Sequence, residues 1–318
     1  MSALPQAMVV RAGWAVLVAA LLVAPWLFYP LFLVKVLCYA LFACAFNLLL
    51  GTCGLMSFGH AAFFGSAAYI AGHAAKEWGL PFEAAMLCAV GGASAIGAVF
   101  GYISIRRQGI YFAMITLALA QLIYFLALQL PFTHAEDGLT AIPRGKVLGL
   151  FPLDDNMVLY YTTAVIFLGG FSLVHLVLNS TFGQVVRAVR DNEMRAVSLG
   201  FEVNRFKLLA FTLSAAIAGL AGANKAIAFK LATLVDVHWS TSGNVVLMTL
   251  LGGLGTLFGP VAGAIFFVAL ENYLADSGLP VQLVIGAIVI GCILLFRRGL
   301  VGEIENLLGM LARRSKKS

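Results

Sequence analysis

Long apolar runs, separated by short breaks of glycine, proline or charged residues, follow one another along most of this chain. A helix needs about 20 mostly apolar residues to cross the hydrocarbon core of a bilayer. Runs close to this length predict membrane-spanning helices at residues 13–29, 31–50, 55–75, 82–105, 110–130, 157–178 and 208–229.

The apolar stretch at residues 244–274 is too long for one span, and several glycines and Pro260 interrupt it. We divide it into a short span at 244–254 and a full span at 258–274, and we expect the last span at 281–296. The predicted fold class is therefore an all-α polytopic membrane protein with about ten transmembrane helices. We expect residues 1–318 to form a single transmembrane domain.

Basic residues at the ends of the spans predict the orientation, because Lys and Arg are enriched in cytoplasmic loops. With the N-terminus inside, about ten spans put Arg106, Arg107, a charged segment at 180–207 and the C-terminal tail in the cytoplasm. The polar loop at 132–156 then lies outside. A single crossing at 244–274 would leave the tail outside, against its four terminal basic residues.

This arrangement allows an inverted repeat, because the second to fifth spans begin outside and the seventh to tenth begin inside. Each half contains a glycine-broken segment, one near residues 51–59 and the other near 252–259. Glycine-interrupted segments at matching positions of two halves indicate a transport pathway. The alternative is that glycine here only lets helices pack closely.

Composition and charge agree with lipid as the solvent. Hydrophobic residues make up 62% and charged residues 11% of the 318, and the mean hydropathy is +0.98. Soluble domains are about half apolar and about a quarter charged. The net charge of +6 lies at helix ends and indicates membrane topology rather than nucleic-acid binding. The five cysteines form no CxxC pair, and we expect free thiols.

No pattern for catalysis or metal binding occurs: the sequence has no Walker A motif, HExxH, GxSxG or metal-spaced Cys/His cluster. We therefore expect no enzyme activity, no catalytic residues and no metal. Ion-coupled transporters usually carry buried carboxylates, and among the ionisable residues expected in spans only Glu271 qualifies. These residues are Lys35, His60, His73, His175, Lys225 and Glu271. A partner should therefore supply the energy for any transport.

The charged segment, "STFGQVVRAVRDNEMRAVSLGFEVNRFK" at 180–207, is too long for a simple connection, which needs about 2–8 residues. Thr181 and Gln184 fit a capping box, and Asp191 or Asn192 can cap a second short helix. Gly200 suits the left-handed end of that helix, and Asn204 can cap the next span. We expect a folded docking element, although a solvated loop with topogenic charge is the alternative.

Helical spacing divides the side chains of this second helix between two faces. One face carries Met194, Val197 and Phe201 and is apolar. We expect the charged side chains to point away from it, and these are Arg187 and Arg190 of the first short helix and Glu193 and Arg195 of the second.

Four segments together resemble one family, the LivM-type permeases of branched-chain amino acid (hydrophobic amino acid uptake) ABC importers. They are "GLMSFGHAAFFGSAAYIA", "EDGLTAIPRG", "RAVRDNEMRAVSLGFEVNRFKLLAFTLSAAIAGLAG" and "LLGGLGTLFGPVAGA", in this order along the chain. The resemblance implies a multi-pass permease of the bacterial inner membrane with both termini cytoplasmic. It implies four kinds of partner: a second LivH-like permease, two cytoplasmic ATPase subunits, a periplasmic substrate-binding protein and an amino-acid substrate. The partner subunits would hydrolyse ATP, so this chain would bind no cofactor directly.

The resemblance also implies that the charged segment is the coupling loop on the ATPase, and that 132–156 is a periplasmic loop. Glu193, Ala196 and Gly200 occupy the E-x-x-A-x-x-x-G positions, whereas Met194–Arg195 stand where small alanines are common. The expected ATPase-coupling residues are Arg187, Arg190, Asp191, Glu193, Met194, Ala196, Val197 and Gly200.

The resemblance does not determine the substrate or the residues that line its pathway. Branched-chain or other amino acids are the first expectation, and urea or short amides the alternative. Rival interpretations are an ion-coupled secondary transporter or channel, and an assembly subunit without a pathway. For His60 a simple helix–helix hydrogen bond is the competing interpretation, and Asn47, Thr116, Gln121 and Asn224 are weaker candidates. The expected pathway residues are Ser57, Phe58, Gly59, His60, Gly252, Gly253 and Gly255.

Overall fold

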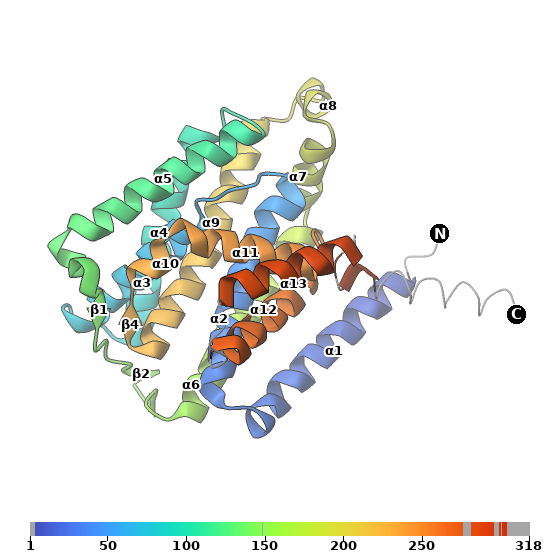
Figure 1. The fold of residues 1–318 in the computed structure, drawn as a ribbon. Coiled ribbons are helices and arrows are strands. Elements are labelled where there is room, and N and C mark those ends of the chain that lie inside the picture. The colour runs from blue at the N-terminus through green and yellow to red at the C-terminus, as the bar shows by residue number, and fades with distance from the viewer. Residues whose placement is uncertain (1–3, 148, 276–280, 296–298, 300, 304–318) are drawn as a thin grey trace, which may run out of the picture.

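The chain folds into a bundle of helices in the structure, a computed structural model that describes residues 4–147, 149–275, 281–295, 299 and 301–303 (Figure 1). The long helices are α1 (Leu4–Leu27), α2 (Pro30–Asn47), α3 (His60–Lys76), α4 (Phe82–Ser104), α5 (Ile110–Gln129), α6 (Asn156–Asn179) and α9 (Val203–Phe229). Shorter α-helices are α7 (Thr181–Asp191), α8 (Glu193–Ser198), α10 (Leu234–Val237), α11 (Trp239–Gly252), α12 (Gly259–Ala275) and α13 (Val281–Leu295). A π-helix, η1 (Leu48–Cys53), continues α2, and two 3-10 turns lie at η2 (Pro131–Thr133) and η3 (Ala135–Asp137).

Within the described residues, five helical segments are long and apolar enough to cross a membrane. They are Pro30–Cys53, Phe82–Ser104, Ile110–Gln129, Asn156–Asn179 and Val203–Phe229. Shorter apolar helices occupy Arg11–Leu27, Gly259–Ala275 and Val281–Cys292. The end of the expected last span, at 296, and the basic tail from 304 lie outside the described residues.

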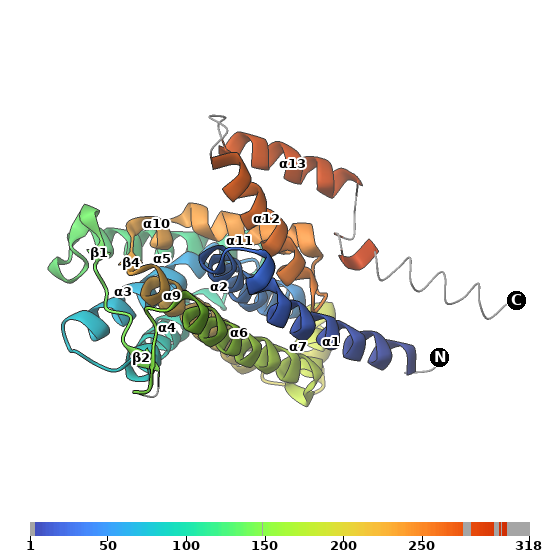
Figure 2. The same ribbon diagram turned by 90° about the horizontal axis from the view of Figure 1, so that it is seen from below.

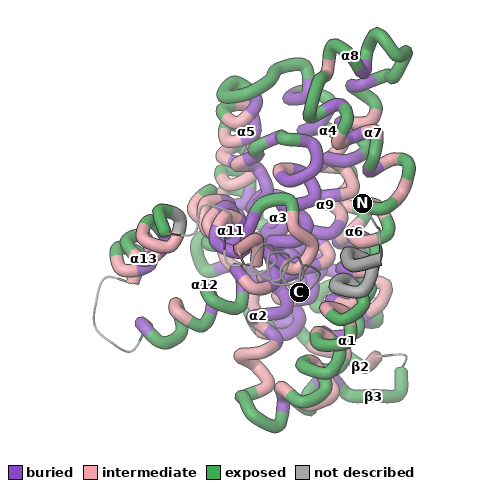
Figure 3. Tube along the Cα trace, turned by 90° about the vertical axis from the view of Figure 1, so that its right-hand side faces the viewer, coloured by how far each residue is buried: buried purple, intermediate pink, exposed green. Residues whose placement is uncertain are grey.

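Helix α9 is the centre of the bundle and packs against α2, α3 and α4. Buried stretches gather around α2, α3 and α9, whereas α12 and α13 carry more exposed surface (Figure 3). Small residues let α9 approach its neighbours: Gly222 lies against the backbone of Phe64, and Gly219 lies against Ala93. Helices in lipid associate through such close van der Waals contact, because the lipid is as apolar as their side chains.

Helices α7 and α8 lie at one end of the bundle and the short strands at the other (Figures 1 and 3). We call these the α8 end and the strand end. Helix α12 packs on α11 and α2, and α13 stands off from the main bundle (Figure 2). The first turns of α1 lie toward the α8 end (Figure 1).

The fold is predominantly helical, and the strand end adds short two-residue strands that the sequence did not predict. Strand β1 (Leu139–Thr140) pairs antiparallel with β4 (Leu231–Ala232), and β2 (Lys146–Val147) pairs with β3 (Phe151–Pro152). The expected outer loop at 132–156 is therefore partly ordered. Its backbone groups need hydrogen-bond partners once the loop covers the bundle, and the strand end of α9 provides them.

The span expected from residue 55 also begins later than predicted, because α3 starts at His60. Gly54 has a positive φ of 68°, which ends η1, and the chain from 54 to 59 is not helical. The Ser57 hydroxyl accepts a hydrogen bond from Gly59 N (3.1 Å), forming a local turn that competes with helix. The second expected break is present too, because residues 253–258 separate α11 from α12.

The contact at Gly222 predicts a stability difference. A Cβ at this position would overlap the carbonyl oxygen of Phe64, so Gly222→Ala should lower the free energy of unfolding by about 1–3 kcal/mol. Gly91→Ala is the matched control, because its Cβ would meet nothing within 4 Å, and Ala is the better helix former. Thermal unfolding in detergent measures both, and equal midpoints would contradict the close packing.

Candidate functional site

The charged segment at 180–207 folds into two consecutive short helices, α7 and α8, as its cap signals predict. The cap of α7 is Ser180, whose Oγ accepts from Gly183 N at 3.2 Å. The predicted capping box of Thr181 and Gln184 is therefore wrong by one residue. Ser180 takes the role because it has the extended backbone of a cap, with a ψ of 167°, whereas Thr181 is already helical.

Helix α8 has both predicted end signals. The Asn192 Oδ1 accepts from Arg195 N at 3.0 Å, and Gly200 follows the helix with a φ of +87°. Phe201 N closes the end by donating to Ala196 O at 3.1 Å. The expected cap at Asn204 is wrong: α9 begins one residue earlier, at Val203, after Glu202 and without a side-chain cap.

The apolar face of α8 is exposed to the outside of the bundle. Met194 is 80%, Val197 54% and Leu199 70% exposed. On the opposite side, Ala196 is buried in a small cluster with Val189 and Val203. This cluster fixes α8 on α7 and α9, so the exposed apolar residues sit on a supported helix. Leu199 was missing from the sequence-based set, although its place beside the Gly200 cap was a usable signal.

Two of the four charged side chains that were expected to point away from the apolar face, Arg187 and Arg190, instead reach backbone carbonyls. Arg187 donates to Leu178 O, and Arg190 Nη1 donates to Gly51 O at 2.6 Å. Both carbonyls lie in the last residues of a helix, α6 or η1, where they lack intrahelical partners. Asp191 accepts from Arg190 at 3.0 Å, and Arg195 is exposed as expected.

Glu193 is also turned inward, against the prediction. Its Oε2 accepts from Lys207 Nζ at 2.7 Å and from Gln108 Nε2 at 2.6 Å. Lys207 belongs to α9 and is 4% exposed, and Gln108 lies in the turn between α4 and α5. The first residue of the E-x-x-A-x-x-x-G pattern therefore attaches α8 to the bundle.

The predicted pathway residues of the first break lie inside the bundle. Ser57 and His60 are fully buried. The Ser214 hydroxyl donates to Ala45 O at 2.5 Å and accepts from His60 Nε2 at 2.8 Å. Gly59 packs against Thr116, whose hydroxyl accepts from Phe58 N at 3.2 Å. These contacts join α2, α3, α5 and α9, as the helix–helix interpretation of His60 expects.

The two broken segments meet at the α8 end of the bundle. The Asn47 Nδ2 donates to Thr256 O at 2.9 Å, and its Oδ1 accepts from Gly255 N at 3.0 Å. A Cβ on Gly51 would lie 3.0 Å from the Gly255 backbone. Glycine is required at this crossing because the two backbones touch.

The remaining glycines of the second break serve the same close packing. Gly252 ends α11 against the carbonyl of Gly259, and Gly253 has a φ of 118°. A side chain on Gly252 would collide with the first turn of α12. The turn from α11 to α12 is consequently sharp.

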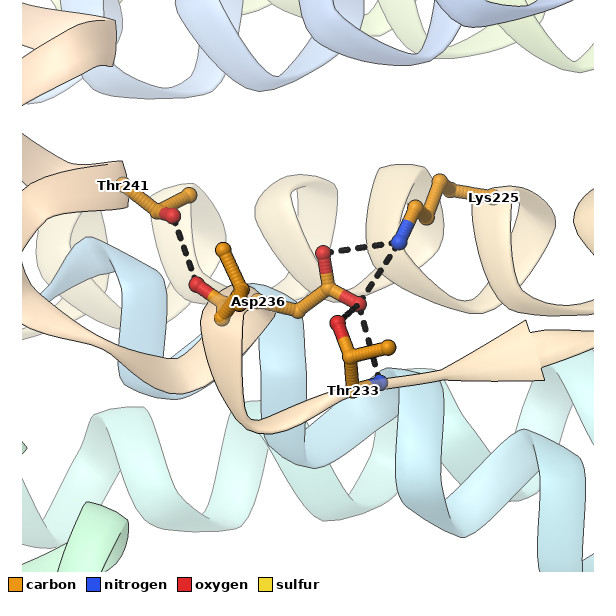
Figure 4. Close-up of polar contacts among 5 residues, drawn as sticks. Lys225, Thr233, Asp236 and Thr241 are labelled. Carbon is orange, nitrogen blue, oxygen red and sulfur yellow. Dashed lines mark hydrogen bonds and ion pairs between the residues drawn. The ribbon is translucent and has the colours of Figure 1, made fainter. Parts of the chain in front are cut away.

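A buried carboxylate near the strand end was missed by sequence reasoning. Asp236 on α10 is 3% exposed and pairs with Lys225 of α9 at 2.6 Å (Figure 4). Thr233 donates to the same carboxylate through its backbone N and its hydroxyl, at 3.2 and 3.0 Å. Glu271 was the only carboxylate expected within a span, and Asp236 is a further buried carboxylate that lies outside the predicted spans. Glu271 itself pairs with Lys35 at 3.0 Å and is half-buried.

Comparisons with known proteins identify the family of the sequence. A family model described as the permease component of branched-chain amino acid transport systems matches residues 28–297. The high-affinity branched-chain amino acid transport system permease protein LivM of Escherichia coli strain K12 is 26% identical over 275 residues, which cover 79% of this chain and 65% of the relative. LivM of Salmonella typhimurium is 25% identical over the same shares. The matched region thus covers less than two thirds of the length of these relatives.

A second relative matches over a shorter stretch. The autoinducer 2 import system permease protein LsrC of Klebsiella pneumoniae is 30% identical over 167 residues, which are 50% of this chain and 46% of LsrC. No solved structure matches the chain. Because the family model covers most of the sequence, the chain belongs to the family of permease components of branched-chain amino acid transport systems.

Proposed function

We propose that this chain is the permease subunit of an ATP-driven importer that moves branched-chain or related amino acids across the bacterial inner membrane by alternating access. The observation that carries the proposal is the supported helix α8, which presents Met194, Val197 and Leu199 to the outside of the bundle. An exposed apolar patch on a fixed element is typical of a protein interface. The family membership supplies the class of transporter.

The proposed assembly contains this chain, a LivH-like permease, two cytoplasmic ATPases and a periplasmic substrate-binding protein. The ATPase would contact α8, since burying an apolar side chain of this size contributes about 1.5–3 kcal/mol. The binding protein would dock at the strand end, on the loop at 132–156.

We propose a single permease domain over 1–318 with about ten crossings, both termini cytoplasmic and an inverted repeat of two halves. The opposite placement of α8 and the strands supports this topology (Figure 1). The glycine-broken segments at 51–59 and 252–259 lie against each other at the α8 end, which supports their pairing as two related elements.

The match to LsrC, which covers half of the chain, favours autoinducer 2 as a second candidate cargo. Urea and short amides stay as the alternative that the sequence left open. An ion-coupled mechanism has one point in its favour, the buried Asp236, but this carboxylate already has Lys225 and Thr233 as partners. ATP-driven uptake therefore remains the preferred proposal.

Reconstitution into liposomes tests this function. The chain with its permease, ATPase and binding-protein partners should take up radiolabelled leucine, isoleucine or valine only when ATP and binding protein are present. The chain alone should show no uptake under a proton or sodium gradient. Gradient-driven uptake by the chain alone would overturn the proposal in favour of a secondary transporter.

The pathway at Ser57 can be probed in a variant without the native cysteines. We expect Ser57→Cys to react with a water-soluble thiol reagent faster during ATP turnover than at rest, because alternating access must open the buried site. Ala45→Cys, fully buried on α2, is the control and should react slowly in both states. Equal labelling of Ser57→Cys in both states contradicts a place in the pathway.

Gly200→Val tests whether the end of α8 matters for coupling. Its φ of +87° strains a β-branched residue by about 1–3 kcal/mol, so α8 should shift and uptake per ATP hydrolysed should fall severalfold. Gly79→Val carries similar strain at φ +61°, in the turn between α3 and α4, and should lose stability without uncoupling. Identical coupling in the two variants would refute the role of α8.

A further inference from the structure

A polar side chain of α7 reaches directly into the first broken segment. Arg190 Nη1 donates to Gly51 O at 2.6 Å. The alkyl stem of the same residue lies on the next turn, because a Cβ on Gly54 would be 2.9 Å from Arg190 Cγ. Arg190 thus contacts the end of η1 through both its charged head and its stem, while its side chain is 39% exposed.

The segment held by Arg190 is itself tied to the second break. Asn47, one residue before η1, bonds the turn between α11 and α12 with both ends of its amide, at Gly255 N (3.0 Å) and Thr256 O (2.9 Å). A Cβ on Gly255 would lie 3.7 Å from Gly51 O, the same carbonyl that Arg190 holds. Three elements far apart in sequence therefore meet around one carbonyl group.

Other contacts of the charged segment hold α7 and α8 against each other. Ala196 of α8 packs with Val189 of α7 and Val203 of α9, and Asn192 caps α8 directly after α7 ends. A push on α8 would reach α7 through this cluster. From α7, Arg190 is the side chain that contacts η1 by a hydrogen bond.

We propose that Arg190 is a positioning residue that transmits displacement of α7 and α8 through Gly51 and Asn47 to both glycine-broken segments. The inference rests on the proposed function, in which α8 receives the motion of an ATPase. Arg190 acts inside the chain and not as part of the docking surface. A charge-assisted hydrogen bond to a carbonyl left open at a helix end is a stiff link, because it is short and stronger than a neutral one.

Hydrogen exchange on the isolated chain in detergent tests the link without any partner. Arg190→Ala should speed amide exchange in the turn at 253–258 about tenfold, as expected for loss of a hydrogen bond to a charged group. The matched control is Arg205→Ala, which removes an arginine that is 78% exposed and pairs with Glu202 on the surface. Equal exchange of this turn in the two variants would overturn the link, whatever the chain transports.

Uptake and ATP hydrolysis in the reconstituted complex then distinguish transmission of motion by Arg190 from a merely structural role. Arg190→Ala should lower uptake per ATP hydrolysed about tenfold while ATP hydrolysis itself continues, and Arg190→Lys should restore part of the coupling. Arg205→Ala should behave like the original chain. A parallel loss of uptake, ATP hydrolysis and thermal stability in Arg190→Ala, without rescue by lysine, would mean that Arg190 only caps η1.

A double-variant cycle checks that Arg190 and Asn47 act on one route. Asn47→Ala should uncouple uptake from ATP hydrolysis like Arg190→Ala, and the double variant should be little worse than either single one. If the losses of uptake per ATP hydrolysed multiply in the double variant, Arg190 and Asn47 contribute independently. That result would contradict transmission from Arg190 through Asn47. If the original complex hydrolyses ATP but takes up nothing, the proposed function fails, while the exchange result still decides the link.

Discussion

The bundle depends on the close approach of α9 to α3, where the backbone of Phe64 fills the space that a side chain at Gly222 would occupy. Apolar side chains gain little from each other in lipid, so helices associate where small residues bring their backbones into contact. Gly219 continues the same face against Ala93 of α4. With α9 fixed in this way, its ends determine where the polar elements of the molecule can attach.

The polar contacts at the α8 end have a shared physical origin. Helix ends leave carbonyl groups without partners, and near a membrane water cannot always supply them. Arg187 and Arg190 donate to carbonyls at the ends of α6 and η1, respectively. Lys207 instead holds Glu193. The charge of this segment therefore attaches two short helices to the bundle, and the exposed surface left for a partner is mostly apolar.

At the strand end, charged side chains also satisfy buried polar groups, here through an ion pair. Lys225 and Asp236 form a buried pair that also fixes the first turn of α10 through Thr233 (Figure 4). A buried charge without a partner is costly, whereas a pair with further hydrogen bonds is tolerated. Arg144 donates to Ala228 O at 2.8 Å, so the loop at 132–156 is clamped onto α9. Both ends of α9 thus hold an ordered polar element.

Features that depend on neighbouring residues could be predicted from the sequence. Span positions such as α4 and α5, both glycine breaks and the caps at Asn192 and Gly200 follow from apolar run length, glycine content and cap chemistry, all of which act over a few residues. The start of α3 escaped prediction, because the Ser57 turn is held partly by Thr116 on α5.

The partners of the charged side chains could not be predicted, because they depend on contacts between distant segments. Arg190 meets Gly51, and Glu193 meets Lys207 and Gln108, across 139, 14 and 85 positions of sequence. Asp236 is a buried carboxylate because α10 packs against α3 and α5, where Lys225 of α9 reaches it. Such pairings depend on which helix ends lie side by side, and helical spacing alone cannot distinguish a charge facing solvent from one facing an open carbonyl.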